Sequence, residues 1–374
     1  MWFRKKDIKI NDKDIVYLDD LKGYVLPHAS TQYTGRIISD TLRYRPSPDK
    51  IDDIETIVII YLPSQKKPNV KDRYYHEFYV VWNALSMVYT DVDFIGFNVL
   101  TGNVNELNNL VDESTLLVVS ADFSHFLPFK QALAQENCAA HGLMHKQLEN
   151  DCMKHVDDVR SFKVMFNVLG EVSMQWTGRT RSPGLKGVGY HSYLLRAQPQ
   201  PDRHKPQGFF VTAYDRKFQQ RECLGNWTRW TQEKENKLVK DVITKGSTTS
   251  RLTGGKHLNI PVEYYTVTYL YKERNTNRPF IRGWHGVLMD AFYLPDVFLE
   301  NTFEDGRWIT PQDNEWPEIG TRQQFDMSET LNKLQNKAGH SSDNNHQKPN
   351  KNYVLYTSHV KHNKYDKYNY LKLD

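Results

Sequence analysis

The sequence has little cysteine: Cys138, Cys152 and Cys223 are the three among 374 residues. An odd, sparse set in a chain of this length does not make the disulfide framework that small secreted proteins use. No basic segment followed by an apolar run opens the chain, so we expect a protein that is not secreted. The sequence therefore predicts three reduced thiols and a location in the cytoplasm or the nucleus.

Long hydrophobic runs are missing as well. The longest, such as residues 56–62 and 115–119, are far shorter than the roughly 20 apolar residues that span a bilayer. We therefore expect no transmembrane helix and no membrane partner. The net charge is only +4, and this small excess permits a nucleic acid or another anionic partner without requiring one.

The length of the chain favours two domains, with a single domain as the alternative. Residues 196–208 read RAQPQPDRHKPQG, a stretch with three prolines and no apolar periodicity. Such composition is typical of an exposed connector. We therefore predict an N-terminal domain over residues 1–196, a Pro-rich linker over residues 197–207 and a C-terminal domain over residues 208–374.

The first half alternates short apolar runs with helical stretches. Residues 56–62 and 115–120 are β-branched and continuously apolar, which is typical of strands buried on both faces. Residues 79–89 and 129–153 have the periodicity of helices. Strands alternating with helices indicate an α/β domain with a mostly parallel sheet and flanking helices.

The second half mixes strands and helices without this alternation. Residues 208–213 and 262–271 are aromatic and β-branched and predict strands. Residues 231–244 and 327–337 predict helices, and residues 338–352, rich in Asn, His, Ser and Lys, predict a mobile loop. The pattern favours an α+β domain.

Two motifs in the first half carry residues suited to chemistry. Residues 26–30 read LPHAS and are followed by YTG, and residues 120–125 read SADFSH at the end of a predicted strand. In open α/β sheets, ligand-binding residues collect at the carboxyl ends of strands. With the closing GVGYHSYLL at residues 187–195, these motifs resemble the Memo (mediator of cell motility) family. The resemblance covers residues 20–196.

The family resemblance implies a metal pocket, because its two motif histidines belong to a site similar to that of class III extradiol dioxygenases. It makes His28 and His125 metal ligands and Asp122 a catalytic carboxylate. Neutral imidazole suits iron, copper or zinc, and a carboxylate either ligates the metal or orients a histidine. The YHE segment resembles the family's EHSLEVQLP helix start, which adds His76 as a catalytic candidate, with Tyr79 where the family has glutamate.

Two positions depart from the family pattern. The chain reads LPSQ where the family has GPSH, so Gln65 replaces a metal histidine and is a cofactor-binding candidate. Residues 157–162 align with the family's CGRHPI, which puts Asp157 in place of the pocket cysteine. We expect one metal ion on His28, His125 and Asp157, a two-histidine, one-carboxylate set typical of non-haem iron, or a site that has lost its metal.

A second group of metal-ligand residues occurs on the helix predicted for residues 129–153. Cys138, His141 and His145 are spaced by three and four residues, which puts them on one helix face where they could clamp a metal ion. Gly142 stands where a zinc protease would need its glutamate. Solvated histidines on an exposed helix are the favoured interpretation.

The second half carries a further resemblance. Its segments FFVT and RECLG, the latter at residues 221–225, resemble the LFVT and LRGCIG motifs of the AMMECR family, with Glu222 at a family glycine. Further matches follow in order up to about residue 357. The resemblance makes Cys223 a catalytic candidate and Arg221 a cofactor-binding one.

Cys223 has two interpretations. A tight turn at residues 222–225 would hold its sulfur beside Arg221, and beside His285 if the fold brings that residue close, which favours a reactive thiolate. A small buried side chain is the alternative.

Function follows from these resemblances by analogy. Memo-like and AMMECR-like domains commonly occur together, often with a radical-SAM protein, which suggests modification of a nucleic-acid base or a similar substrate. Our leading hypothesis is a non-haem metal-dependent oxidoreductase, or a component of one, whose second domain presents the substrate. The alternative is a non-catalytic module that binds a ligand or peptide.

Overall fold

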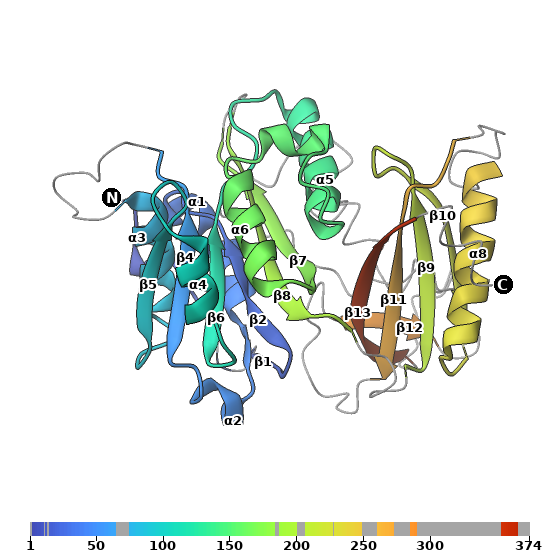
Figure 1. Cartoon of the computed structure of the whole chain (residues 1–374), viewed down its shortest axis with the longest axis horizontal. Coiled ribbons are helices and arrows are strands. Elements are labelled where there is room, and N and C mark those ends of the chain that lie inside the picture. The colour runs from blue at the N-terminus through green and yellow to red at the C-terminus, as the bar shows by residue number, and fades with distance from the viewer. Residues whose placement is uncertain are drawn as a thin grey trace, which may run out of the picture. The chain divides into compact units, whose positions relative to one another are not determined.

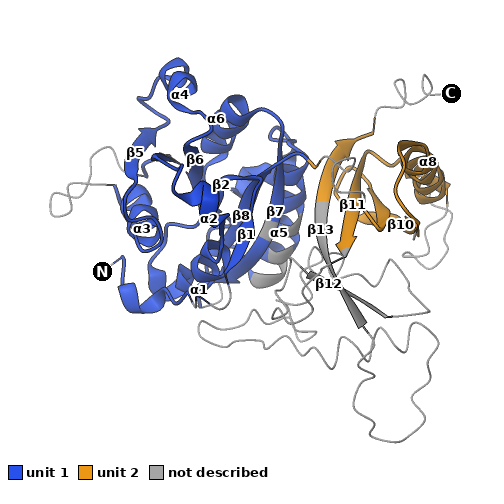
Figure 2. Ribbon diagram, turned by 90° about the horizontal axis from the view of Figure 1, so that it is seen from below, with its two compact units in different colours: residues 1–198, 309–323 blue, residues 199–308, 324–374 orange. Residues whose placement is uncertain are grey.

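The computed structural model describes residues 2–10, 12, 15–64, 75–183, 187–199, 206–226, 228–248, 260–272, 285–289 and 353–365. The described residues fall into two compact units (Figure 2): those up to Gln198 form unit 1 and those from Pro199 on form unit 2. The boundary between them lies within the predicted linker. Across these ranges, no helix combines the length and apolar character that crossing a membrane requires.

Unit 1 is built on a six-stranded mixed sheet with the order β5-β4-β6-β2-β8-β7. The first four strands in that order run parallel, and the last two pair antiparallel. Its strands are β2 (Leu21–Leu26), β4 (Thr56–Tyr61), β5 (Asp93–Asn98), β6 (Thr115–Ser120), β7 (Val172–Arg181) and β8 (Gly189–Ala197). The prediction of an α/β unit is confirmed at this level.

Helices cover both faces of this sheet, which explains the continuous apolar runs of β4 and β6. On one face lie α1 (Thr31–Leu42) and α3 (His76–Leu85), and on the other lie α4 (Val104–Leu110) and α6 (Val159–Leu169) (Figures 1 and 2). The small elements of unit 1 are η1 (Lys5–Asp7), β1 (Val16–Leu18), β3 (Tyr44–Pro46) and α2 (Pro48–Ile51).

One glycine in the sheet is required by close packing. Gly23 in β2 has φ of +151° and is paired with Leu117 of β6. A Cβ atom at Gly23 would lie 1.8 Å from the carbonyl oxygen of Leu117. Any larger residue would therefore push apart the two strands whose ends carry the candidate site described below.

The helix expected over residues 129–153 is shorter in the structure. It forms α5 (Phe129–Met144), and Lys146, just beyond it, has φ of +56°. A positive φ is incompatible with continuing a right-handed helix. A separate 3-10 turn, η3 (Asp151–His155), follows. The helix predicted over residues 79–89 corresponds to α3, which begins earlier, at His76, and ends earlier, at Leu85.

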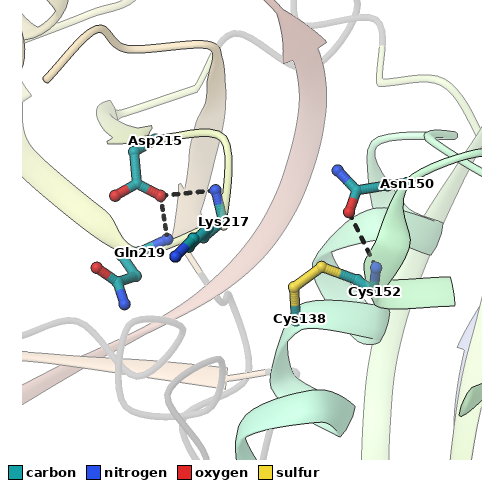
Figure 3. The surroundings of a disulfide bond; sticks show 6 residues. All are labelled: Cys138, Asn150, Cys152, Asp215, Lys217 and Gln219. Atoms are coloured by element: carbon teal, nitrogen blue, oxygen red, sulfur yellow. Dashed lines mark hydrogen bonds between the residues drawn. A yellow bond between two sulfur atoms is a disulfide. The ribbon is translucent and has the colours of Figure 1, made fainter. Parts of the chain in front are cut away.

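The expectation of three reduced thiols is wrong for two of them. Cys138 of α5 is paired with Cys152 of η3 as a disulfide, with Cα atoms 5.3 Å apart (Figure 3). The Asn150 side chain caps η3 by accepting a hydrogen bond from the backbone N–H of Cys152 at 3.0 Å. The turn that ends α5 thus returns the chain to the helix, a proximity that cysteine spacing alone does not predict.

Unit 2 is an antiparallel sheet with the order β10-β9-β11-β13-β12, packed against helix α8 (Gln232–Thr248). Val211, Val239 and Val242 are central in the apolar core between them. Its strands are β9 (Gly208–Tyr214), β10 (Gln220–Asn226), β11 (Tyr264–Lys272), β12 (His285–Met289) and β13 (Tyr353–Lys364). This layout agrees with the predicted α+β class. The predictions for residues 327–337 and 338–352 lie outside the described residues.

Candidate metal centre

The polar residues of unit 1 converge at the carboxyl ends of three neighbouring parallel strands, β4, β6 and β2. His28 follows β2 by two residues, Asp122 follows β6 by two, and Ser64 follows β4 by three. Helix α3 begins at the same edge with His76 and Glu77. Loops at this edge of a parallel sheet are where open α/β folds bind ligands.

His28, His76 and Glu77 form a group that could hold a metal ion. One ligand atom from each residue lies within 4.8 Å of the ligand atoms of the other two. Among the described residues, this is the set of histidine, cysteine and carboxylate side chains that lies close enough to share an ion. Bonds near 2 Å place two ligands of one ion at most about 4 Å apart. Small side-chain rotations would therefore close the group around an ion.

Two aspartates extend this group on the His28 side. Nε2 of His28 lies 3.7 Å from Oδ2 of Asp122 and 3.5 Å from Oδ2 of Asp157. Burial raises the pKa of the Asp122 carboxyl above its ordinary value, the nearby His28 ring opposes this rise, and Asp157 adds to it. A cation between these groups would relieve the crowding of negative charge.

The buried carboxylates each use one oxygen in a hydrogen bond and turn the other toward the centre. Oε1 of Glu77 accepts from the backbone N–H of Ser64 at 2.7 Å, and Oδ1 of Asp122 accepts from the backbone N–H of His28 at 3.1 Å. Oε2 of Glu77 is buried, makes no hydrogen bond among the described residues, and lies 3.3 Å from Nδ1 of His76. A buried carboxylate is costly unless it meets a cation, and a metal ion shared with the imidazole of His76 would supply one, so the residues fit a metal ion.

His76 is held by rings on two sides. The Trp2 indole stacks on it with centroids 4.7 Å apart, and the His28 ring meets it edge-on at 5.4 Å. Burial lowers the pKa of His76, although Glu77 acts in the opposite direction. The ring is therefore held close to the neutral form that ligates metals.

Of the three predicted ligands, His28 belongs to this group, and Asp157 and His125 are not among its members. Asp157 adjoins the group through His28, as described above. His125 is exposed, and its Nδ1 donates to the backbone oxygen of Phe123 at 2.8 Å, which leaves Nε2 available. Its ring lies close enough to lower the pKa of Asp122. Gln65 lies outside the described residues.

Glu77 is the site residue that sequence reasoning missed. The resemblance puts Tyr79 where the family has glutamate, and the Tyr79 ring packs edge-on against Trp82 with ring centroids 6.4 Å apart. Glu77 was nevertheless visible as the carboxylate beside His76 in the YHE segment. No spacing within this segment selects Glu77, because its place at the site comes from the start of α3 meeting the strand ends.

The candidate in unit 2 lies inside a strand. Cys223 belongs to β10, is 4% exposed, and its sulfur accepts a hydrogen bond from the hydroxyl of Thr212 at 3.4 Å. The tight turn expected at residues 222–225 is wrong, since this segment is extended and pairs with β9. Arg221 is also buried, at 3% exposure. The arrangement favours the interpretation of Cys223 as a small packed side chain.

His285 does not join Cys223. It lies on β12, at one edge of the five-stranded sheet, whereas β10 forms the opposite edge. Neighbouring strands are about 4.8 Å apart, so four strand spacings separate these two positions by roughly 19 Å. The expectation that His285 supplies positive charge to this thiol is wrong.

The histidines of α5 are buried rather than solvated. His141 and His145 are 7% and 5% exposed, and their rings stack with centroids 6.5 Å apart. Burial lowers the pKa of His141 to about 4. Since Cys138 is bonded to Cys152, this face offers no cysteine thiolate in the disulfide form.

A scan of protein-family models and a search of curated proteins find no match to this chain. The fold and the site therefore define a structural class of protein. Unit 1 is an α/β layer structure with a histidine–carboxylate group, able to hold a metal ion, at the carboxyl ends of its parallel strands.

Proposed function

We propose that unit 1 binds one divalent metal ion through His28, His76 and Glu77, and that the chain is a non-haem metal-dependent oxidoreductase or a component of one. The observation that carries the proposal is the convergence of these three side chains within 4.8 Å. Two imidazoles and one carboxylate are the ligand set of non-haem iron(II) oxygenases, which leave further positions open. We therefore place iron first, with zinc or copper as the alternatives.

The ligand chemistry supports this order of metals. The group contains nitrogen and oxygen ligands and no sulfur, which disfavours copper(I), because that ion prefers thiolates and thioethers. A bound iron(II) ion would supply a redox-active Lewis acid. The chain itself would supply the proton chemistry through Asp122, whose Oδ2 lies 3.7 Å from Nε2 of His28 and whose pKa is raised by burial.

The wider setting of this reaction rests on the resemblances. The motif order and the position of His28 and Asp122 at strand ends support a Memo-like unit 1, and the ordered segments from residue 208 on support an AMMECR-like unit 2. In this proposal unit 2 presents the substrate, a nucleic-acid base or a similar molecule. A radical-SAM protein is the proposed partner.

A second candidate function is a non-catalytic module for a ligand or peptide. It is favoured by the distances around His28, whose Nε2 lies 3.7 Å from Oδ2 of Asp122 and 3.5 Å from Oδ2 of Asp157. Such an ion network would satisfy those charges without a metal. The two candidates therefore differ in whether a metal ion or the His28 ring alone meets the two aspartates.

Anaerobic titration of the full chain with iron(II), followed by calorimetry, separates the two candidates. We expect one ion per chain, and a loss of this binding in Glu77→Gln, which removes the charge of the carboxylate and keeps its shape. His141→Ala is the control, because it alters the histidine face of α5 and should leave the stoichiometry unchanged. An unaltered chain that takes up no iron or zinc would leave the binding module as the better account.

A further inference from the structure

We infer that Ser120 is a positioning residue that keeps the His28 proton on Nδ1 and so leaves Nε2 to face the metal position; the inference rests on the proposed metal site. Ser120 ends β6 and is fully buried. Its hydroxyl oxygen lies 2.6 Å from the backbone oxygen of Glu77 and 3.1 Å from Nδ1 of His28. One hydroxyl thus contacts two of the three residues around the centre.

Counting hydrogens assigns the direction of both bonds. A serine hydroxyl has one hydrogen to donate, and a backbone carbonyl oxygen can only accept. The hydroxyl therefore donates to Glu77. Toward His28 the same oxygen acts as the acceptor, which requires a hydrogen on Nδ1. In the neutral ring the lone pair is then on Nε2.

The free nitrogen faces the two aspartates that border the candidate centre. Nε2 faces Oδ2 of Asp122 and Oδ2 of Asp157 at 3.7 and 3.5 Å. Metal-ligating histidines commonly donate their other ring N–H to a fixed acceptor, which sets the tautomer and the ring orientation. Ser120 fulfils this role here, and its own hydrogen bond to Glu77 holds the acceptor still.

The same hydroxyl ties together two parts of the fold. Glu77 lies in the first turn of α3, next to His76, whereas His28 follows β2. The serine between them therefore fixes the ring of one ligand relative to the helix start that carries the other two. Ser120, the first residue of the SADFSH motif, thus has a specific structural role.

The first test reads the tautomer in the metal-free chain. Long-range proton–nitrogen NMR of the full chain labelled with 15N-histidine distinguishes Nδ1–H from Nε2–H, and His28→Asn assigns the signals. We expect Nδ1–H in the unaltered chain and a shift toward Nε2–H, the form that imidazole favours in water, in Ser120→Ala. The inference is overturned by Nε2–H in the unaltered chain, or by identical His28 signals in both.

The second test measures zinc affinity by calorimetry. Loss of an outer contact to a ligand typically weakens metal binding by about 10- to 100-fold, which we expect for Ser120→Ala, with recovery in Ser120→Thr. Ser192→Ala is the matched control, since Ser192 is equally buried in the same sheet and its hydroxyl bonds Thr41 and Thr177 instead.

The outcomes separate this inference from the proposed function. An equal loss of affinity in Ser120→Ala and Ser192→Ala would mean general loosening of the sheet and would overturn the positioning role. An unaltered chain that binds no metal would remove the proposed function. In that case the NMR spectrum alone still decides whether Ser120 sets the tautomer of His28.

Discussion

The candidate sites that the sequence offers in the first half and in the second half lie in contrasting places. In unit 1 the polar residues stand just beyond the ends of β2, β6 and β4, where side chains from several strands meet. In unit 2, Arg221 and Cys223 are buried within β10; Cys223 pairs with Thr212 of β9, and the register shifts at Arg221. The difference teaches that residues just beyond strand ends can be brought together from several strands, whereas residues within a paired strand mainly pack the core.

The largest effect expected from this difference is on metal binding. His28→Ala removes a ligand nitrogen, so we expect iron or zinc affinity to fall by at least about 100-fold, more than the loss of an outer contact. Cys223→Ala should leave affinity unchanged, since its sulfur contacts Thr212 inside unit 2. Parallel calorimetric titrations of both variants check this. Equal losses in the two would erase the distinction between the motifs.

Acid should weaken unit 1 through His141. Its pKa is lowered to about 4 by burial, whereas an unfolded histidine titrates near 6.5. Between these values the unfolded state binds more protons, so the free energy of unfolding falls as the pH drops through this window and levels below it. The total is roughly 3 kcal/mol.

Denaturant unfolding of the chain, followed at several pH values from 7 to 4, measures how the free energy of unfolding of unit 1 changes with pH. His141→Leu should flatten this dependence, although His76 and His191, whose pKa values are also lowered mainly by burial, keep part of it. An unchanged slope in His141→Leu would show that this ring titrates freely in the folded chain. The conclusion that His141 of α5 is buried would then be wrong.

The smallest effect concerns Cys223 itself. As a packed side chain it should resist iodoacetamide in the folded protein, and Cys223→Ala should cost about 1 kcal/mol in the stability of unit 2. Unfolding without reductant should expose one thiol, and reductant should expose three, because Cys138 and Cys152 are paired. Rapid labelling of Cys223 in the native chain would restore it as a reactive candidate.

Much of the fold could be predicted because its elements depend on local composition and periodicity in the sequence. The apolar runs of β4 and β6 and the connector after β8 are visible in composition and periodicity. The end of α5 was not, because the positive φ of Lys146 and the return of Cys152 to Cys138 depend on tertiary packing. The burial of the α5 histidines could not be predicted for the same reason.

The candidate site was predictable to the extent that its residues stand in motifs. His28, Asp122 and Asp157 were named from them and lie together, and His76 joins them from the start of α3. Glu77 was missed because only the arrangement of α3 against the strand ends turns its carboxylate inward. Residues brought together from separate elements in this way leave no single spacing in the sequence.

X-ray absorption spectroscopy of the zinc-loaded chain tests the central claim most directly, because it reports the atoms bound to the metal. If the ion occupies the group of His28, His76 and Glu77, the spectrum should show imidazole scattering and only nitrogen and oxygen at about 2.0–2.2 Å. A sulfur shell at about 2.3 Å would place the metal at a cysteine instead. Sulfur ligation, or a chain that retains no zinc, would contradict the account.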